Sequence, residues 1–147
     1  MTRRLLVLAS LAALFAGVAP IAVDAAPASA PACVVKITAM QFHPRHVAPG
    51  GSSVVHLKVK NCTREPQKAT LTWLGEFTGP TPGIPAGCPA IDPLGQPLDV
   101  GPRGALPASL GYLVFPSCTA TALSATARIT GADGTVLAEK TALLRIS

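Results

Sequence analysis

Apolar and polar residues alternate through most of this 147-residue chain, which limits it to strands that bury one face. In SVVHLKVKNC, residues 53–62, an apolar residue at every second position is followed by His or Lys. The segments KATLTWLGEF, residues 68–77, and CTATALSATARIT, residues 118–130, repeat this pattern. No stretch beyond residue 30 carries the three-to-four-residue spacing of an amphipathic helix. The sequence therefore predicts an all-β protein.

Three further segments have the length and composition of strands: CVVKITAM at residues 33–40, ALPASLGYLVF at 105–115 and TVLAEKTALLRI at 135–146. GADG, residues 131–134, predicts a hairpin turn before the last of them, because Asp and Gly tolerate its backbone angles. Six or seven short antiparallel strands in a chain of this length predict a sandwich of two sheets.

The stretch between Phe77 and Ala105 breaks the alternation, because it contains seven prolines and six glycines. Proline cannot donate to a sheet hydrogen bond and glycine weakens a strand, so residues 78–105 are predicted to form one long ordered loop. PLDV within it is a candidate for a short edge strand. The loop is either a crossover between the two sheets, held by Cys88, or a functional loop, since long loops in compact domains often carry function.

The N-terminal thirty residues have the features of a secretion signal. A pair of arginines precedes the apolar run LLVLASLAALFAGVAPIAV, and small-x-small sites allow cleavage after Ala25 or after Ala30. We therefore expect residues 1–30 to be a signal peptide and residues 31–147 to be one domain. The protein should be secreted or extracytoplasmic, with no membrane span once the signal is removed.

Retention of this segment as a membrane anchor and lipidation of Cys33 are the alternatives to cleavage. Pro20 and Asp24 interrupt the apolar run, and Pro31 departs from the pattern that precedes a lipidated cysteine. The heavy use of Ala, Pro, Gly and Arg favours a bacterial source with a GC-rich genome.

The chain has four cysteines, which are Cys33, Cys62, Cys88 and Cys118. Together with a secretion signal they predict two disulfides, formed in an oxidising compartment. None of the four lies in a Cys-x-x-Cys pair, which argues against structural zinc and against thioredoxin-like redox chemistry.

HVAPGGSSVVHLKVKN, residues 46–61, has the Pro-Gly-Gly, alternating strand and Asn order that recurs in immunoglobulin-like domains of secreted bacterial proteins. Trp73 lies mid-strand, where such domains often bury a tryptophan. Over most of residues 31–147 the chain therefore resembles this class, which implies an immunoglobulin-like β-sandwich. It departs from antibody-type domains, whose tyrosine lies two residues before the second core cysteine, because Tyr112 lies six residues before Cys118.

The strand pairing of immunoglobulin-like sandwiches implies which cysteines join. If the strand that ends at Cys62 is antiparallel to the first strand, Cys33 starts beside it. If the strand that ends at Cys62 also pairs with the Tyr112 strand, Cys118 lies at the opposite end of the sandwich. The long loop that carries Cys88 begins at that same end, where the Trp73 strand ends. We therefore expect bridges from Cys33 to Cys62 and from Cys88 to Cys118, because a disulfide spans at most about 7 Å between Cα atoms.

All three histidines, His43, His46 and His56, lie within fourteen residues and close to Met40. This region also resembles the first half of a cupredoxin. The blue-copper site of a cupredoxin takes one histidine after the strand that corresponds to residues 53–61, and then Cys, His and Met from the last hairpin. No histidine follows residue 56 and no methionine follows residue 40, so the blue-copper ligands are missing. A non-blue site made by His43, His46 and Met40 is the alternative. We expect histidines exposed at a sheet edge, with no metal and no cofactor.

The acidic residues are predicted in loops, turns or solvent-facing positions: Glu65, Glu76, Asp92, Asp99, Asp133 and Glu139. A small filled sandwich places no two of them in a cleft for acid–base catalysis, and the chain lacks a Gly-x-Ser-x-Gly motif. We therefore expect no catalytic residues and no enzyme. The net charge is +5 at pH 7, but the basic residues are scattered, which argues against a nucleic-acid partner.

These observations predict a secreted, disulfide-stabilised, non-catalytic binding or structural module of the bacterial cell envelope or exterior. Its partner would be an unknown protein or a cell-envelope polymer. GCPAIDPLGQPL, residues 87–98, resembles a segment of small secreted bacterial subtilisin inhibitors, which implies as one alternative a protease inhibitor that uses the loop around Cys88. The other alternative is a small apolar-ligand carrier, similar to the sandwich apoproteins that hold antibiotic chromophores. It would need a cleft lined by the available aromatic residues, which are Phe42, Trp73, Phe77, Tyr112 and Phe115.

Overall fold

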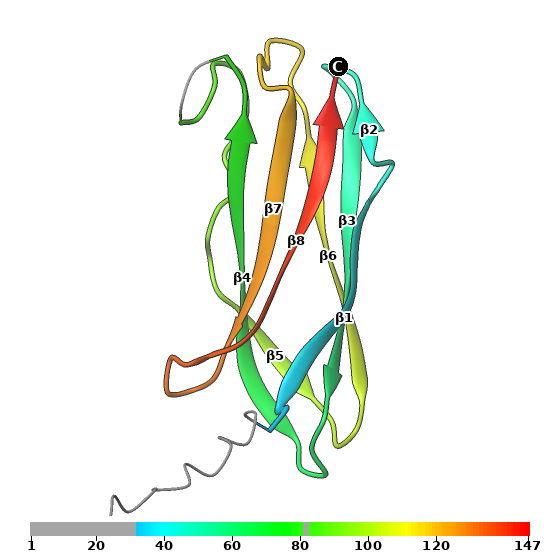
Figure 1. Ribbon diagram of the computed structural model, residues 1–147, viewed down its shortest axis with the longest axis vertical. Helices are drawn as coiled ribbons and strands as arrows, with labels where there is room; N and C mark the ends of the chain where they lie inside the picture. The colour runs from blue at the N-terminus through cyan, green and yellow to red at the C-terminus, as the bar shows by residue number, and fades with distance from the viewer. Residues whose placement is uncertain (1–31, 81–82) are drawn as a thin grey trace, which may run out of the picture. The chain divides into compact units, whose positions relative to one another are not determined.

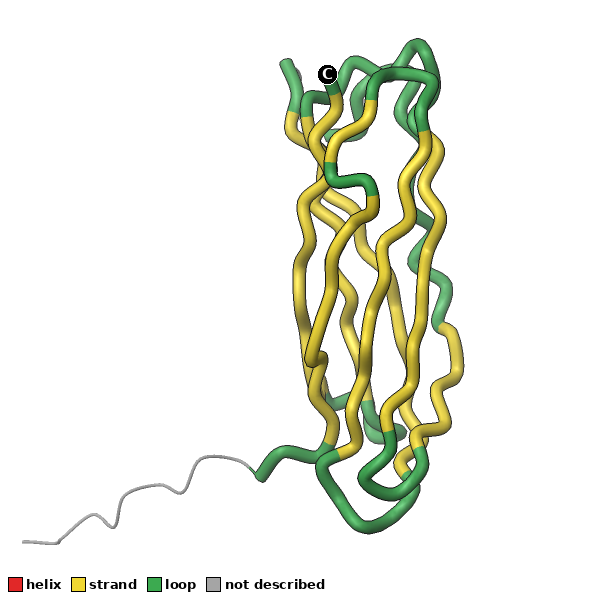
Figure 2. The backbone as a smooth tube through the Cα atoms, turned by 90° about the vertical axis from the view of Figure 1, so that its right-hand side faces the viewer, coloured by secondary structure: helices red, strands yellow, loops and turns green. Residues whose placement is uncertain are grey.

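The computed structural model describes residues 32–80 and 83–147, and every regular element in those ranges is a β-strand (Figure 1 and Figure 2). The strands are β1 (Val35–His43), β2 (His46–Val47), β3 (Ser52–Asn61), β4 (Gln67–Thr78), β5 (Gln96–Val100), β6 (Ala105–Leu113), β7 (Ala122–Thr130) and β8 (Val136–Ile146). They form a three-stranded sheet in the order β1-β3-β6 and a five-stranded sheet in the order β2-β8-β7-β4-β5. The predicted all-β sandwich of two sheets is confirmed.

The structure has eight strands where six or seven were expected, and β2 is the strand that the sequence did not reveal. It contains only His46 and Val47, too few residues for alternation to mark it. It pairs with β8 in parallel, the one parallel pair among the described strands. The amide of Arg145 donates to the carbonyl oxygen of Arg45 at 3.0 Å, and the amide of Ser147 donates to that of Val47 at 3.1 Å. The chain thus passes from the edge of one sheet, at β1, to the edge of the other.

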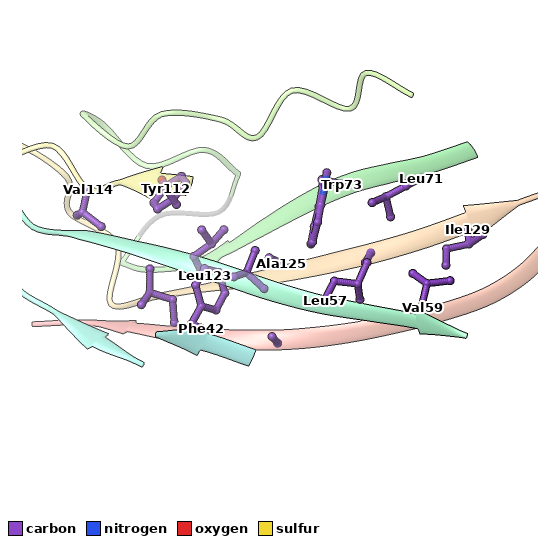
Figure 3. Close-up of a cluster of buried hydrophobic side chains, with 14 of the residues drawn as sticks. Phe42, Leu57, Val59, Leu71, Trp73, Tyr112, Val114, Leu123, Ala125 and Ile129 are labelled. Atoms are coloured by element: carbon purple, nitrogen blue, oxygen red, sulfur yellow. The ribbon is translucent and has the colours of Figure 1, made fainter. Parts of the chain in front are cut away.

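The core lies between the sheets and contains the residues that alternation assigned to it. On β7, the side chains of Leu123, Ala125, Ala127 and Ile129 are all 0% exposed. Figure 3 shows side chains of β3, β4 and β7 gathered between the sheets, with Trp73 of β4 among them. Full burial of one Leu or Ile side chain contributes roughly 1.5–3 kcal/mol, so this row is a main source of the sandwich's stability.

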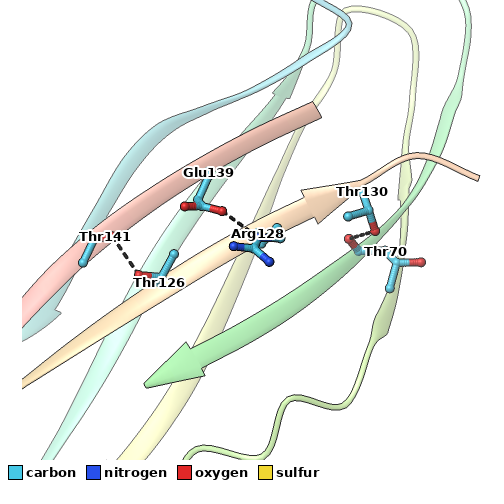
Figure 4. Close-up of polar contacts among 6 residues, drawn as sticks. All are labelled: Thr70, Thr126, Arg128, Thr130, Glu139 and Thr141. Carbon is cyan, nitrogen blue, oxygen red and sulfur yellow. Dashed lines mark hydrogen bonds and ion pairs between the residues drawn. The ribbon is translucent and has the colours of Figure 1, made fainter. Parts of the chain in front are cut away.

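The outer face of the five-stranded sheet is polar (Figure 4). The Nε of Arg128 donates to Glu139 Oε2 at 2.6 Å, and the hydroxyls of Thr126 and Thr141 lie 2.8 Å apart. The Arg128 and Glu139 side chains are 42% and 43% exposed, so solvent screens the pair and it adds about 0–1 kcal/mol at most. This face is the solvated side that the alternation of β7 predicts.

The long proline- and glycine-rich segment is a crossover between the sheets. After β4 the chain forms a loop and then returns as β5 along the edge of β4, from Gln96 opposite Leu71 to Val100 opposite Gln67. Residues 101–104 then lead to β6 in the three-stranded sheet. The expected short edge strand at PLDV is therefore present as part of β5.

Two disulfides join the cysteines in the expected pairs. The Cα atoms of Cys33 and Cys62 lie 5.7 Å apart, and those of Cys88 and Cys118 lie 4.4 Å apart. Both β1 and β6 run antiparallel to β3, which is the arrangement on which the expected pairing depended. Disulfides persist in oxidising environments, so this pairing suits an extracytoplasmic protein.

Residues 1–30, where we expect a signal peptide, lie outside the described residues, so the signal and its cleavage site stay predictions. Within residues 32–80 and 83–147, no helix has the length and apolar character needed to cross a membrane.

Candidate ligand-binding groove

The three histidines do not converge on one site. The register of β1 and β3 places His56 opposite Gln41, two residues before His43 on the same outer face. His46 belongs to the other sheet through β2, and its Nε2 contacts the hydroxyl oxygen of Ser147. In the part of the chain that the structure describes, no three His, Cys, Asp or Glu side chains are placed to hold a metal ion. The sequence-adjacent histidines are thus divided between two sheets.

A groove of about 420 Å³ lies instead beside the free edge of β6. Three segments far apart in the sequence line it: β4, the loop after Cys88 with the first residue of β5, and the end of β6 with the residues that follow it. The lining residues are Trp73, Pro89, Ala90, Ile91, Asp92, Leu94, Gln96, Leu110, Gly111, Tyr112, Leu113 and Phe115. Of the aromatic residues expected around a cleft, Trp73, Tyr112 and Phe115 are among them. Phe42 is buried elsewhere in the core, and Phe77 packs on Tyr112 with ring centroids 6.5 Å apart.

The loop that forms one wall of the groove is attached to the sandwich at its start, through Cys88 and Pro89. The Cys88–Cys118 disulfide joins it to the segment after β6. One residue later, the hydroxyl of Tyr112 donates to the carbonyl oxygen of Pro89 at 2.9 Å. The segment that resembles a protease-inhibitor loop therefore lies against the sandwich as a wall of the groove.

Two glycines allow the loop to lie this close. A Cβ on Gly75 of β4 would lie 3.1 Å from both Cδ1 and Cγ1 of Ile91, so the missing side chain makes room for Ile91. Gly87 has a φ of +71°, in the left-handed region that favours glycine, and a Cβ there would lie 2.3 Å from the Ser117 hydroxyl oxygen. Neither glycine stood out in the sequence, because each is needed only against a residue far along the chain.

The rim of the groove exposes large apolar side chains to solvent. Leu94 is 71% exposed, Leu113 is 51% exposed and Phe115 is 43% exposed. The floor contains Trp73 and Tyr112, which are 1% and 6% exposed. A concave site lined by apolar side chains is typical of small-molecule binding sites. A single exposed leucine elsewhere on the surface would not indicate such a site, because isolated exposed apolar residues are common.

The groove contains few groups that can titrate. Burial raises the pKa of Tyr112 to about 12, so its hydroxyl stays protonated at neutral pH and remains a donor to Pro89. Asp92 is the one carboxylate in the lining and is exposed. No Lys, Arg or His lines the groove. A lone solvated carboxylate beside a neutral phenol does not form an acid–base pair.

Comparison with protein-family models finds no match, and comparison with curated proteins finds none either. Among solved structures, the chain is similar to part of an alkylpurine DNA glycosylase of Pseudomonas fluorescens bound to DNA containing an abasic site analogue. The TM-score is 0.56 at 10% identity, over 79% of this chain and 31% of the glycosylase. It is also similar to part of a cycloisomaltooligosaccharide glucanotransferase of Paenibacillus sp. complexed with cycloisomaltoheptaose, with a TM-score of 0.53 at 12% identity, over 77% of this chain and 14% of that protein.

The PapD-like domain 7 of human CEP192 matches over 89% of this chain and 96% of that domain, with a TM-score of 0.49 at 14% identity. This chain spans less than a third of the glycosylase and less than a sixth of the glucanotransferase. At these identities the likeness extends to the β-sandwich fold and not to an activity, although some of the similar structures are enzymes.

Proposed function

We propose that this protein is a secreted, non-catalytic binding module that holds a small apolar molecule in the groove between β6 and the loop after Cys88. The observation that carries the proposal is the rim of Leu94, Leu113 and Phe115, three large apolar side chains exposed around one concave site. The groove's volume of about 420 Å³ lies in the range of ligand sites, roughly 300–1,000 Å³.

The energetics of such a groove favour an apolar occupant. Each 100 Å² of apolar surface that a ligand and the groove together remove from water contributes about 2.5 kcal/mol to binding. The loop is already attached by Cys88 and by the Tyr112 hydrogen bond, which reduces the entropy lost when a ligand is bound.

Two further observations support the rest of the proposal. The non-catalytic role is supported by the groove's single exposed carboxylate, Asp92, which has no basic partner in the lining. The extracytoplasmic location is supported by the two disulfides together with the expected signal peptide in residues 1–30. Intact mass of the exported form should show a chain that begins at Ala26 or Pro31.

The test is titration of the purified protein with N-phenyl-1-naphthylamine, a neutral apolar dye, followed by energy transfer from tryptophan. Trp73 is the only tryptophan, so the transfer reports on the groove that it lines. We expect saturable binding of one dye per chain. Leu113→Asp should weaken binding at least tenfold, because it places a carboxylate on the apolar rim.

Leu143→Asp is the matched control. Leu143 is 47% exposed, close to the 51% of Leu113, and is a strand residue that does not line the groove. Its substitution should change the dissociation constant less than twofold. Non-saturable binding, or equal effects of the two substitutions, would contradict the proposal.

A further inference from the structure

The indole nitrogen of Trp73 is buried without a hydrogen-bond acceptor. Trp73 is 1% exposed, and its Nε1 is the one buried side-chain nitrogen or oxygen without a partner among the described residues. An indole N–H can only donate, so an acceptor is the only group that satisfies it. Leaving such a donor unpaired away from water is unfavourable, and native proteins pair most of their buried polar groups.

The rest of this protein follows that rule closely, which makes Trp73 an exception that requires an explanation. The two N–H hydrogens of the buried Asn61 amide are shared among three carbonyl oxygens, and its Oδ1 accepts two hydrogen bonds. The hydroxyl of Ser53 donates to the carbonyl oxygen of Pro44 at 2.6 Å. The hydroxyl of Tyr112, which also lines the groove, is engaged by Pro89. The single unpaired buried side-chain donor in residues 32–80 and 83–147 thus belongs to a residue that lines the groove.

The charges of the groove limit which acceptor would suit it. A carboxylate or phosphate would lose its hydration without gaining a cationic partner, because no Lys, Arg or His lines the groove. Asp92 at the same site would also repel an anion. A neutral oxygen, such as the carbonyl oxygen of a ketone, ester or amide, accepts a hydrogen bond without this cost.

We infer that the ligand of the groove is a neutral, mainly apolar molecule with one carbonyl oxygen, which accepts a hydrogen bond from Nε1 of Trp73. The inference rests on the proposed function and makes it more specific. The apolar body of the ligand covers Leu113, Phe115 and Leu94, and its oxygen lies toward the floor of the groove. Trp73 is then a specificity residue, because its N–H favours the oxygenated molecule over a hydrocarbon of the same shape.

The experiment uses three probes of nearly equal size: 2-acetylnaphthalene, 2-isopropylnaphthalene and 2-naphthoate at pH 7. Because Trp73 is the only tryptophan, its indole gives one cross-peak in a ¹⁵N–¹H correlation spectrum of the labelled protein. We expect 2-acetylnaphthalene to move that indole proton downfield. The isopropyl compound should shift the methyl signals of Ile91 and Leu113 but leave the indole proton without a downfield shift, and 2-naphthoate should bind most weakly of the three.

Trp73→Phe supplies the second measurement. The ratio of ketone affinity to hydrocarbon affinity should fall about fivefold or more from wild type to the variant. Comparing this ratio between the two proteins cancels the difference in hydrophobicity between the probes. If the variant fails to fold, the indole shift in the wild type still decides the question. An unmoved indole proton with both neutral probes bound would overturn the inference and leave the proposed function intact. If neither neutral probe binds, the groove is refuted as a ligand site and the inference falls with it.

Discussion

The hydroxyl of Tyr112 donates to the carbonyl oxygen of Pro89 at 2.9 Å. This bond joins the end of β6, which contributes to the floor of the groove, to the start of the loop that forms its wall. The two residues are 23 positions apart in sequence, on β6 and on the loop after Cys88. The bond exists because Gly75 and Gly87 let the loop approach the sandwich and because the Cys88–Cys118 disulfide holds its base.

We predict a high pKa for Tyr112, measured by absorbance at 295 nm. Tyr112 is the only tyrosine, so the titration reports it alone. Burial raises its pKa from 10.0 to about 12 in the folded protein, and the value should return to about 10 in concentrated urea. Because the folded state binds this proton more tightly, its contribution to stability is complete below pH 10 and is lost as the pH rises through 12. A folded-state midpoint near 10 would show that the hydroxyl is not held in the groove.

The two disulfides should contribute equally to stability but unequally to ligand binding. They join residues 29 and 30 positions apart, so replacement of either pair by serine should lower the free energy of unfolding by about 3–4 kcal/mol. Only loss of Cys88–Cys118 should also weaken binding of N-phenyl-1-naphthylamine, because that bridge holds the groove's wall. The Cys33–Cys62 variant is the matched control, and equal loss of dye affinity in both would argue against the groove. Urea unfolding and dye titration measure the two effects.

Asn61 should be one of the least replaceable polar residues. Its Nδ2 donates to the carbonyl oxygens of Glu65, Val100 and Gly101 at 2.6, 3.1 and 3.0 Å, and its side chain is 0% exposed. Asn61→Ala leaves these three buried or half-buried acceptors without that donor, so we expect a loss of about 3 kcal/mol in urea unfolding. Thr141→Val removes an exposed hydroxyl and should change stability by at most about 0.5 kcal/mol. A loss below about 1 kcal/mol for Asn61→Ala would be inconsistent with this network.

The Asn61-Cys62-Thr63 sequence matches a glycosylation sequon, but the folded protein does not offer its asparagine. The Oδ1 of Asn61 accepts from the amide and from the hydroxyl of Thr63, both at 2.8 Å, so both ends of the side-chain amide are engaged. Incubation of the folded, purified protein with an oligosaccharyltransferase and its lipid-linked donor should therefore leave the intact mass unchanged.

We expect no stoichiometric copper after exposure to a slight excess and desalting. His46 contacts Ser147 on the five-stranded sheet, whereas His43 and His56 lie on the outer face of the three-stranded sheet. Retention of one copper per chain that is lost in His43→Ala or His46→Ala would disprove this prediction. Elemental analysis of the desalted protein gives the answer directly.

Much of the architecture could be predicted from residues that act locally. Alternation identified the inward residues of β7, such as Leu123 and Ile129, because a strand turns successive side chains to opposite faces whatever its neighbours are. The disulfide pairing followed from strand direction together with the strand order that the resemblance to immunoglobulin-like sandwiches implied, since antiparallel neighbours place Cys33 beside Cys62 and keep both away from Cys118. These features depend on periodicity and direction, which the order of residues carries.

The candidate site could not be predicted in the same way. Trp73 was expected to be a buried sandwich tryptophan, and its unpaired indole is visible only once the residues around it are known. The aromatic residues Tyr112 and Phe115 were candidates for a cleft, but their position in a groove depends on where the loop after Cys88 lies. The histidines were close in sequence, yet His46 went to the other sheet because β8 presents a free edge to a two-residue strand.

The amino-acid sequence by itself thus determined the longer strands and their buried faces and, once the strand order of immunoglobulin-like sandwiches was assumed, the two bridges between cysteines. Only the tertiary structure decided that Trp73, Pro89 and Leu113 border one apolar groove, that Gly75 makes room for Ile91, and that one indole N–H has no acceptor. The physical reason is the range of the interactions. Alternation and strand direction act between neighbouring residues, whereas a groove and an unpaired donor are defined by which distant segments meet and by what fails to fill the space between them.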